Sequence, residues 1–187
     1  MNCEGLRNLA AALLLSPVAL ICGCHITIGA QPQGTPVAIQ VPLGLPPVPL
    51  PRENHPTVNS IALGRQLFYD TRLSRNNSVS CASCHLPELG FKDARERSIG
   101  IAGARGRRHA PTLVNAVYSA FLFWDGRARS LEAQADGPIT DALEMNQTHE
   151  ALVARLQSDP RYKANFQSAF WDWRYHHGAD HDSNCGL

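Results

Sequence analysis

The 187-residue sequence lacks several features that mark common classes of protein. It has no excess of one charge, with 17 Lys and Arg against 16 Asp and Glu, so its charge predicts neither a nucleic-acid partner nor binding to an anionic membrane surface. Its six cysteines are too few and too unevenly placed for a disulfide scaffold. No stretch alternates like a β-strand. The remaining composition, 44% hydrophobic and 18% charged, is that of a globular domain.

The first 30 residues are typical of a secretory signal peptide. The apolar run from Leu9 to Cys22 is too short for a comfortable transmembrane helix, Arg7 precedes it, and small residues follow it. Cleavage after Ala30 would release an exported chain into an oxidising compartment. Two alternatives stay open: lipid attachment at Cys24, which would anchor the chain to a membrane, and a buried core helix.

Residues 31–56 are rich in proline and are expected to form an extended linker or a strap on the domain surface. Proline occurs at positions 32, 36, 42, 46, 47, 49, 51 and 56. Because proline lacks the N–H that a helix needs and clashes with the preceding turn, this segment cannot hold a helix. The folded domain is therefore expected over residues 57–170.

This domain is predicted to be mostly α-helical, with long loops. Apolar residues recur at helical spacing over about 57–69, 112–118, 130–135, 148–158 and 160–170. Thr57 and Thr148 are candidate N-caps, and Pro160 suits the first position of the last helix. Asp159 and Pro160 are expected to separate the last two helices.

One motif carries the chemistry, the sequence CASCH at residues 81–85. Its two thiols are three residues apart, about one helical turn, so both can reach the vinyl groups of one porphyrin and form thioethers. The next residue, His85, can then turn its imidazole under the iron. A structural zinc site would need a second Cys/His pair, but Cys185 is distant and alone, and a thioredoxin-like dithiol would need a βαβ context. The motif predicts one covalently attached haem c.

The sequence around this motif resembles the bacterial di-haem cytochrome c peroxidase and MauG superfamily. The similarity spans about residues 40–170 in the blocks LGRQLFYDTRLSRNNSVSCASCH, GFKD, SIGIAGARGRRHAPTLVNAVY, FLFWDGRARSLEAQADGPI and ALEM. The family has two haem domains, and this chain resembles the N-terminal one, where peroxide is reduced. The resemblance implies a cytochrome c-like helical haem domain in the periplasm. It also implies reduction of hydrogen peroxide to water with electrons from a small protein, a cytochrome c or a cupredoxin.

The resemblance also implies roles for single residues. Matching positions are Cys81, Cys84 and His85 for haem attachment, Trp124 for electron relay between haems, Gln134 near the peroxide, and Glu144 as the catalytic glutamate. A carboxylate near the haem can move a proton from one peroxide oxygen to the other if burial tunes its pKa. An amide can orient the peroxide by hydrogen bonding. Without the resemblance, Trp124 could be a core aromatic and Glu144 a solvated helix residue.

Two positions depart from the family pattern. Ile101 stands where many members have a histidine that caps the iron, so we expect a permanently open sixth position. His109 stands where an asparagine usually helps bind calcium, which argues against a calcium site and makes His109 a candidate substitute ligand. The Arg-rich loop between Arg95 and Arg108 is expected to lie over a haem edge, where guanidinium groups could pair with propionates.

The end of the chain departs further. Residues 171–187 are polar, rich in histidine and without helical period, and no second CxxCH is present. We expect a truncated, one-haem chain whose tail arises from a frameshift. The alternative is a metal site, whose ligands would be His176, His177, His181 and Cys185.

A second function stays open, that of a mono-haem electron carrier. Such a protein needs a stable sixth ligand, and Met145 is the only methionine after Met1. It lies 60 residues beyond His85, a spacing similar to that in small c-type cytochromes. Its place beside Glu144 in the ALEM block favours a packing role instead.

Overall fold

The computed structural model describes residues 31–51 and 54–170, and within them the chain is mostly helical. The helices are α1 (Val58–Tyr69), α2 (Leu131–Thr140), α3 (His149–Ser158) and α4 (Pro160–Ala169). Short 3-10 turns interrupt the loops at Thr71–Leu73, Cys81–Ser83, Pro87–Leu89, Ile101–Gly103 and Ala116–Tyr118. Across these ranges β-structure is limited to isolated bridges. The predicted fold class is confirmed in its coarse form, a helical domain with long loops.

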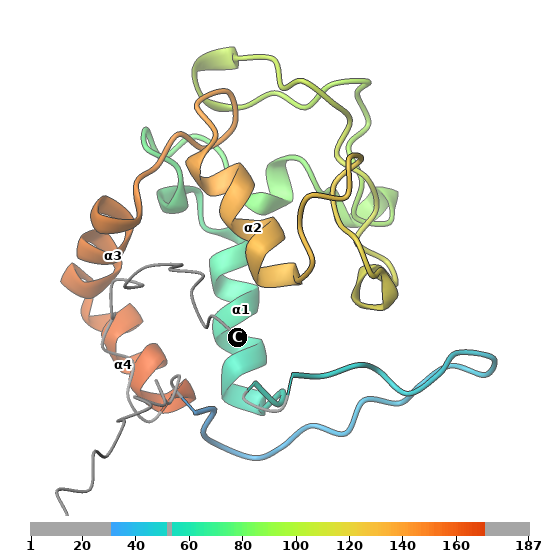
Figure 1. The fold of residues 1–187 in the computed structure, drawn as a ribbon. Helices are drawn as coiled ribbons and strands as arrows, with labels where there is room; N and C mark the ends of the chain where they lie inside the picture. The colour runs from blue at the N-terminus through green and yellow to red at the C-terminus, as the bar shows by residue number, and fades with distance from the viewer. Residues whose placement is uncertain (1–30, 52–53, 171–187) are drawn as a thin grey trace, which may run out of the picture.

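α1 packs against α4, and α4 packs against α3. In Figure 1, α3 and α4 follow one another along one side of α1, and the long loops between α1 and α2 lie above α1. Within the ranges described, no helix combines the length and apolarity needed to cross a membrane. The expected signal peptide and tail, including the proposed tail metal site, lie outside the described residues.

Local capping sets three of the four helices as predicted. The Thr57 side chain accepts a hydrogen bond from the N–H of Ser60, and the Ser60 hydroxyl accepts one from the N–H of Thr57, which forms a capping box for α1. Thr148 caps α3 through its side chain. Asp159 ends α3 and caps α4, and Pro160 occupies the first turn of α4. The predictions for α1, α3 and α4 are confirmed.

Two predicted helices were wrong in extent. The stretch 112–118 is not an α-helix and contains only the short turn Ala116–Tyr118, because Asn115 adopts a left-handed φ of 61° that ends any helix before it. α2 continues to Thr140 through Gly137 and Pro138, both poor helix formers. Packing explains the extension: a Cβ on Gly137 would lie 2.7 Å from the ring of Phe123, so only glycine admits that ring against the helix.

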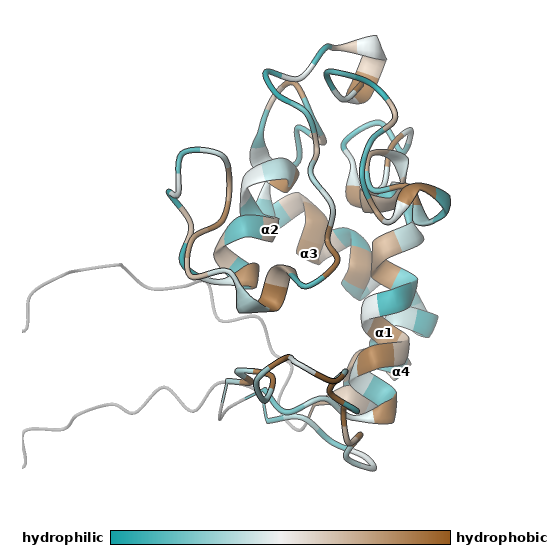
Figure 2. Ribbon diagram, turned by 90° about the vertical axis from the view of Figure 1, so that its right-hand side faces the viewer, coloured by the Kyte–Doolittle hydropathy of each residue, from teal (hydrophilic) through white to brown (hydrophobic). Residues whose placement is uncertain are grey.

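A small apolar core joins α1 to α4. Leu63, Tyr162 and Ala169 are its buried residues. Partly buried side chains pack around them, namely Leu67, Leu156, Phe166 and Phe170. Hydrophobic and hydrophilic bands alternate along α1 in Figure 2, as expected for a helix with one buried face. Besides α4, α1 contacts the turn Cys81–Ser83, so the helix joins this core to the loop that carries the motif at residues 81–85.

A three-residue pattern, Asp-x-Arg, occurs four times in the part of the chain that the structure describes. In each case the aspartate accepts hydrogen bonds from the backbone N–H and the guanidinium of the arginine two residues later. The pairs are Asp70–Arg72, Asp93–Arg95, Asp125–Arg127 and Asp159–Arg161. Bonds between two charged groups are about twice as strong as neutral ones, so each pair stabilises the turn or helix start in which it lies.

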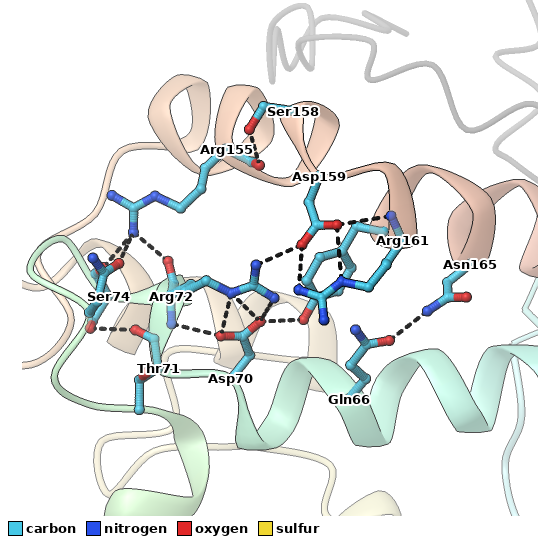
Figure 3. Close-up of polar contacts among 12 residues, drawn as sticks. Gln66, Asp70, Thr71, Arg72, Ser74, Arg155, Ser158, Asp159, Arg161 and Asn165 are labelled. Carbon is cyan, nitrogen blue, oxygen red and sulfur yellow. Dashed lines mark hydrogen bonds and ion pairs between the residues drawn. The ribbon is translucent and has the colours of Figure 1, made fainter.

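Two of these pairs connect α1 with α3 and α4 (Figure 3). The Arg72 guanidinium lies 2.7 Å from Asp159, and the Tyr162 hydroxyl donates to Asp70 at 2.6 Å. Arg155 of α3 adds hydrogen bonds to the carbonyl oxygens of Arg72 and Ser74. The network fixes the start of the loop that leads to residues 81–85.

This network predicts loss of stability in acid. Burial raises the pKa of Asp70, but hydrogen bonds from Arg72 and Tyr162 outweigh it and leave the pKa below its ordinary value. Hydrogen bonds from Arg161 and Arg72 hold the pKa of Asp159 far below its ordinary value. Carboxylates of this kind stabilise the fold above the unfolded pKa of about 4, and that stability is lost as the pH falls toward the folded value.

We therefore expect the urea midpoint of unfolding to be level near neutral pH and to fall below about pH 4. Asp159→Asn should lower the midpoint at neutral pH and make its fall in acid shallower, because one titrating carboxylate is gone. Urea titrations of both proteins across this range measure the effect. Parallel curves for the two proteins would show that Asp159 does not contribute to the acid transition.

Residues 31–51 contain no helix and run as an extended arm away from the helices (Figure 1). Hydrogen bonds fasten it: the N–H of Gln33 donates to Ala169, the N–H of Val37 donates to Pro56, and the Tyr118 hydroxyl donates to Pro46. Its use as a linker or strap remains a prediction.

Candidate functional site

The CASCH motif forms a tight turn. Cys81–Ser83 make a 3-10 turn, in which Ser80 and Ser83 form a capping box, and the N–H of His85 donates to the Cys81 carbonyl at 2.9 Å. Cys81 and Cys84 are both free and half-buried. Burial raises the pKa of both thiols, so they are protonated at neutral pH.

The ring of His85 is oriented by the backbone. Its Nδ1 lies 3.0 Å from the carbonyl oxygen of Phe91. Because a carbonyl only accepts, Nδ1 carries the proton and Nε2 keeps a lone pair for a metal. Gly90 and Phe91 have left-handed φ angles of 68° and 60°, which fold the loop back onto the histidine. Glycine suits this conformation, and Phe91 adopts it at a cost.

These side chains fit a covalently attached haem. Two thiols and the following histidine, with one ring nitrogen bonded to a carbonyl and the other free, form the donor set that a CxxCH haem requires. A surface cavity of about 420 Å³ adjoins the turn, lined in part by Ser83, Arg95, Ile99 and Gly100. Gly100, Ala102 and Gly103 form one part of its wall.

Glu144 lies in the turn that follows α2 and is half-buried. Burial and the nearby Asp141 raise its pKa, against the smaller influence of two arginines. Its carbonyl accepts a hydrogen bond from the N–H of Ile101 at 2.8 Å. A Cβ on Gly100 would lie 2.0 Å from the carbonyl oxygen of Leu143, so the two loops touch through their backbones. The interpretation of Glu144 as a solvated helix residue is wrong.

Ile101 is buried beside this contact. Its apolar side chain has no atom that can bind a metal. The expectation of an open sixth position at the haem iron therefore stays a prediction that fits the residue present.

Trp124 is 63% exposed, so the interpretation as a core aromatic is wrong. Its indole Nε1 donates to the carbonyl of His109 at 3.0 Å. The preceding residue, Phe123, has a left-handed φ of 64°, and the guanidinium of Arg127 lies 3.4 Å from the centre of its ring. The packing of Phe123 between Arg127 and Gly137 thus determines where the backbone presents Trp124.

Comparisons with known proteins identify the family of this chain. The family model described as di-haem cytochrome c peroxidase matches residues 58–183. The chain belongs to the di-haem cytochrome c peroxidase family. The match includes the site residues and continues beyond Phe170 into the tail.

Relatives in this peroxidase family include MauG of Methylorubrum extorquens, which is 46% identical over 123 residues, 66% of this chain and 35% of MauG. The cytochrome-c peroxidase IdrP1 of Denitromonas iodatirespirans is 44% identical over 134 residues, 71% of this chain and 36% of IdrP1. A solved structure of a MauG-like protein associated with microbial copper homeostasis superimposes with a TM-score of 0.66 at 36% identity, over 71% of this chain and 39% of that one. The chain spans about a third of the length of these curated relatives.

The structure brings together some of the predicted site residues of this peroxidase-family chain and leaves others apart. Glu144 contacts the Gly100–Ile101 loop, which borders the cavity beside the CASCH turn. Gln134 is half-buried in α2, and within the described ranges no hydrogen bond ties its side chain to the other site residues.

His109 and Met145, the two candidate sixth ligands, lie in different surroundings. His109 borders a second cavity of about 250 Å³, together with Trp124, rather than the cavity beside the CASCH turn. Met145 is buried, and its N–H donates to the carbonyl of Pro138.

Sequence reasoning missed the pair Asp93 and Arg95. Asp93 is 2% exposed and accepts three hydrogen bonds from Arg95, whose Nη2 also donates to the Ser83 carbonyl at 3.1 Å. Burial raises the pKa of Asp93, but the bonds from Arg95 outweigh it and leave the pKa below its ordinary value. Arg95 thus fastens the CASCH turn to a buried carboxylate. The signal was present: Asp93 ends the GFKD block and begins one of the Asp-x-Arg patterns.

Proposed function

We propose that this chain is a haem c-binding peroxidatic domain that reduces hydrogen peroxide to water. The observation that carries the proposal is the His85 ring, oriented by Phe91 so that Nε2 is free, beside the two thiols of one CASCH turn. Membership of the di-haem peroxidase family supports it. The names of the relatives, cytochrome-c peroxidase and MauG, describe those proteins and indicate the class of chemistry.

Haem c, when bound, supplies an iron that takes up peroxide and exchanges electrons with it. Cys81 and Cys84 would hold the porphyrin, each S–H adding across one vinyl double bond, so attachment needs no oxidant. His85 would bind the iron through Nε2. The reaction consumes one peroxide, two protons and two electrons and forms two waters.

Glu144 would move the proton that peroxide cleavage requires. Its carboxylate accepts a proton from one peroxide oxygen and donates it to the other, which becomes water. Burial supports this role because it raises the pKa of Glu144 toward the operating pH. Gln134 would orient the peroxide through its amide, and Trp124 would pass electrons inward from its exposed position.

The electrons would come from a small periplasmic redox protein, a cytochrome c or a cupredoxin. We propose export to the periplasm because covalent haem attachment and such donors belong to that compartment. Calcium is not part of this proposal, since His109 stands where the expected calcium-binding asparagine would be.

The test is the spectrum of the ferric chain, matured in a host that attaches haem c. We expect covalent haem that resists denaturation, a high-spin spectrum, and a change on adding peroxide. The double variant Cys81→Ala and Cys84→Ala should lose covalent haem completely. A low-spin spectrum with a methionine–iron band, inert to peroxide and abolished in Met145→Leu, would replace the peroxidase with an electron carrier.

A further inference from the structure

We propose that His109 is a positioning residue for Trp124: with Arg95, it forms a hydrogen-bonded bridge that holds the indole at a set position relative to the CASCH turn. The bridge has three links. Trp124 Nε1 donates to the carbonyl of His109 at 3.0 Å, His109 Nδ1 donates to the carbonyl of Arg95 at 2.9 Å, and Arg95 Nη2 donates to the carbonyl of Ser83 at 3.1 Å. Ser83 is the central residue of the haem-attachment motif.

Each link has a defined direction. The acceptors are all backbone carbonyls, so His109 must carry a proton on Nδ1 and the two other donors can act only as donors. The far end of the bridge is rigid, because the Arg95 guanidinium is also bonded to Asp93, which is 2% exposed. A charged pair with one buried partner holds Arg95 more firmly than an exposed pair would.

The bridge matters because packing alone does not hold the indole of Trp124. At 63% exposure the ring has solvent on much of its surface, and exposed side chains exchange rotamers in picoseconds to nanoseconds. A single hydrogen bond from Nε1 therefore decides how much of the time the ring keeps one orientation. Two bonds hold the backbone that carries its acceptor: the His109 imidazole donates to the carbonyl of Arg95, and the N–H of Asp93 donates to the carbonyl of Ala110. Loss of the imidazole removes the one made by residue 109 itself.

Two substitutions at residue 109 separate the hydrogen bond from the bulk of the side chain. Asparagine carries its amide nitrogen on Cγ, as histidine carries Nδ1, so His109→Asn can donate to the same carbonyl. Leucine has similar bulk and no donor. We expect His109→Asn to keep the bridge and His109→Leu to break it.

Fluorescence of the haem-loaded full chain tests the bridge. Trp171→Phe and Trp173→Phe leave Trp124 as the single tryptophan of three. Energy transfer to haem shortens the fluorescence lifetime of an indole according to its distance and orientation. We expect one dominant short lifetime in this background and in His109→Asn. In His109→Leu a longer component should grow about fivefold, the population change that one net hydrogen bond gives. Identical decays in His109→Leu and the background would overturn the bridge.

Thr112→Val is the matched control. The Thr112 hydroxyl donates to the carbonyl of Gly90 from the same loop but has no link to Trp124. The fluorescence lifetime of Trp124 in Thr112→Val should match that of the background protein. An equal change of lifetime in Thr112→Val and His109→Leu would overturn the proposal, because general loosening of the loop would then explain both. If His109→Leu does not keep the far-UV circular dichroism of the background, the variant His109→Ser is used instead, because serine lacks the imidazole ring but is polar.

The consequence for electron transfer rests on the proposed function of Trp124. Peroxide turnover with reduced cytochrome c as donor should fall several-fold in His109→Leu and recover in His109→Asn. A changed lifetime with unchanged turnover would remove Trp124 from the electron route and leave the bridge supported. An unchanged lifetime would overturn the bridge whatever the turnover.

Discussion

Replacement of Glu144 with glutamine is expected to lower peroxide turnover by about 100- to 10,000-fold, the range for loss of a general acid–base group. Glutamine keeps the size and the hydrogen-bonding shape of glutamate but cannot take a proton from peroxide. Glu144 contributes its carbonyl, not its side chain, to the bond from Ile101, so the local backbone should be unchanged. Haem attachment and the ferric spectrum should therefore stay as in the parent.

The pH profile gives an independent check. Burial raises the pKa of Glu144 above its ordinary value of 4.5, and the ionised form is needed to accept the first proton. Turnover of the parent should therefore fall on the acid side as the pH drops through this raised pKa, and the residual activity of Glu144→Gln should lack that limb. Glu132→Gln, at an exposed acidic residue in the first turn of α2, is the matched control and should behave as the parent. An acid limb that persists in Glu144→Gln belongs to another group.

Gly100→Ala is expected to damage both stability and activity. A Cβ at this position would lie 2.0 Å from the carbonyl oxygen of Leu143 and 2.6 Å from that of Glu144. Both neighbours are backbone atoms, so no side-chain rotation relieves the clash and one loop must move. We expect a loss of about 1–3 kcal/mol in the free energy of unfolding, as for overpacked interiors.

Activity should fall with it, because displacement of the loop breaks the hydrogen bond from Ile101 and moves Glu144. Gly64→Ala is the control. Gly64 lies within α1 with no atom near its added Cβ, and alanine there should be neutral or stabilise by about 0.4–1 kcal/mol. Urea titration and peroxide turnover of both variants measure the contrast. A Gly100→Ala protein as stable and active as the parent would show that the two loops separate easily.

Prediction of the fold from sequence worked where a short segment decides the outcome. α1, α3 and α4 begin at Thr57, Thr148 and Asp159, whose side chains cap the backbone a few residues away. The prediction of a helix at 112–118 was wrong because Asn115 takes a left-handed backbone conformation, which the spacing of apolar residues does not indicate. The predicted range of α2 was too short because the helix continues through Gly137, where the ring of Phe123, distant in sequence, packs against it.

The same distinction between local sequence and tertiary packing applies to the site residues. The sequence by itself determined the two thiols and the histidine, since CASCH places all three within about one helical turn and their chemistry depends on spacing alone. Only the tertiary structure decided the state of the side chains: Nε2 of His85 is free because Phe91 folds back onto Nδ1, and the pKa of Glu144 is raised because the folded chain buries its carboxyl group and places Asp141 nearby. Burial and hydrogen bonding between distant segments tune a pKa or a tautomer, and neither is a property of a short stretch of sequence.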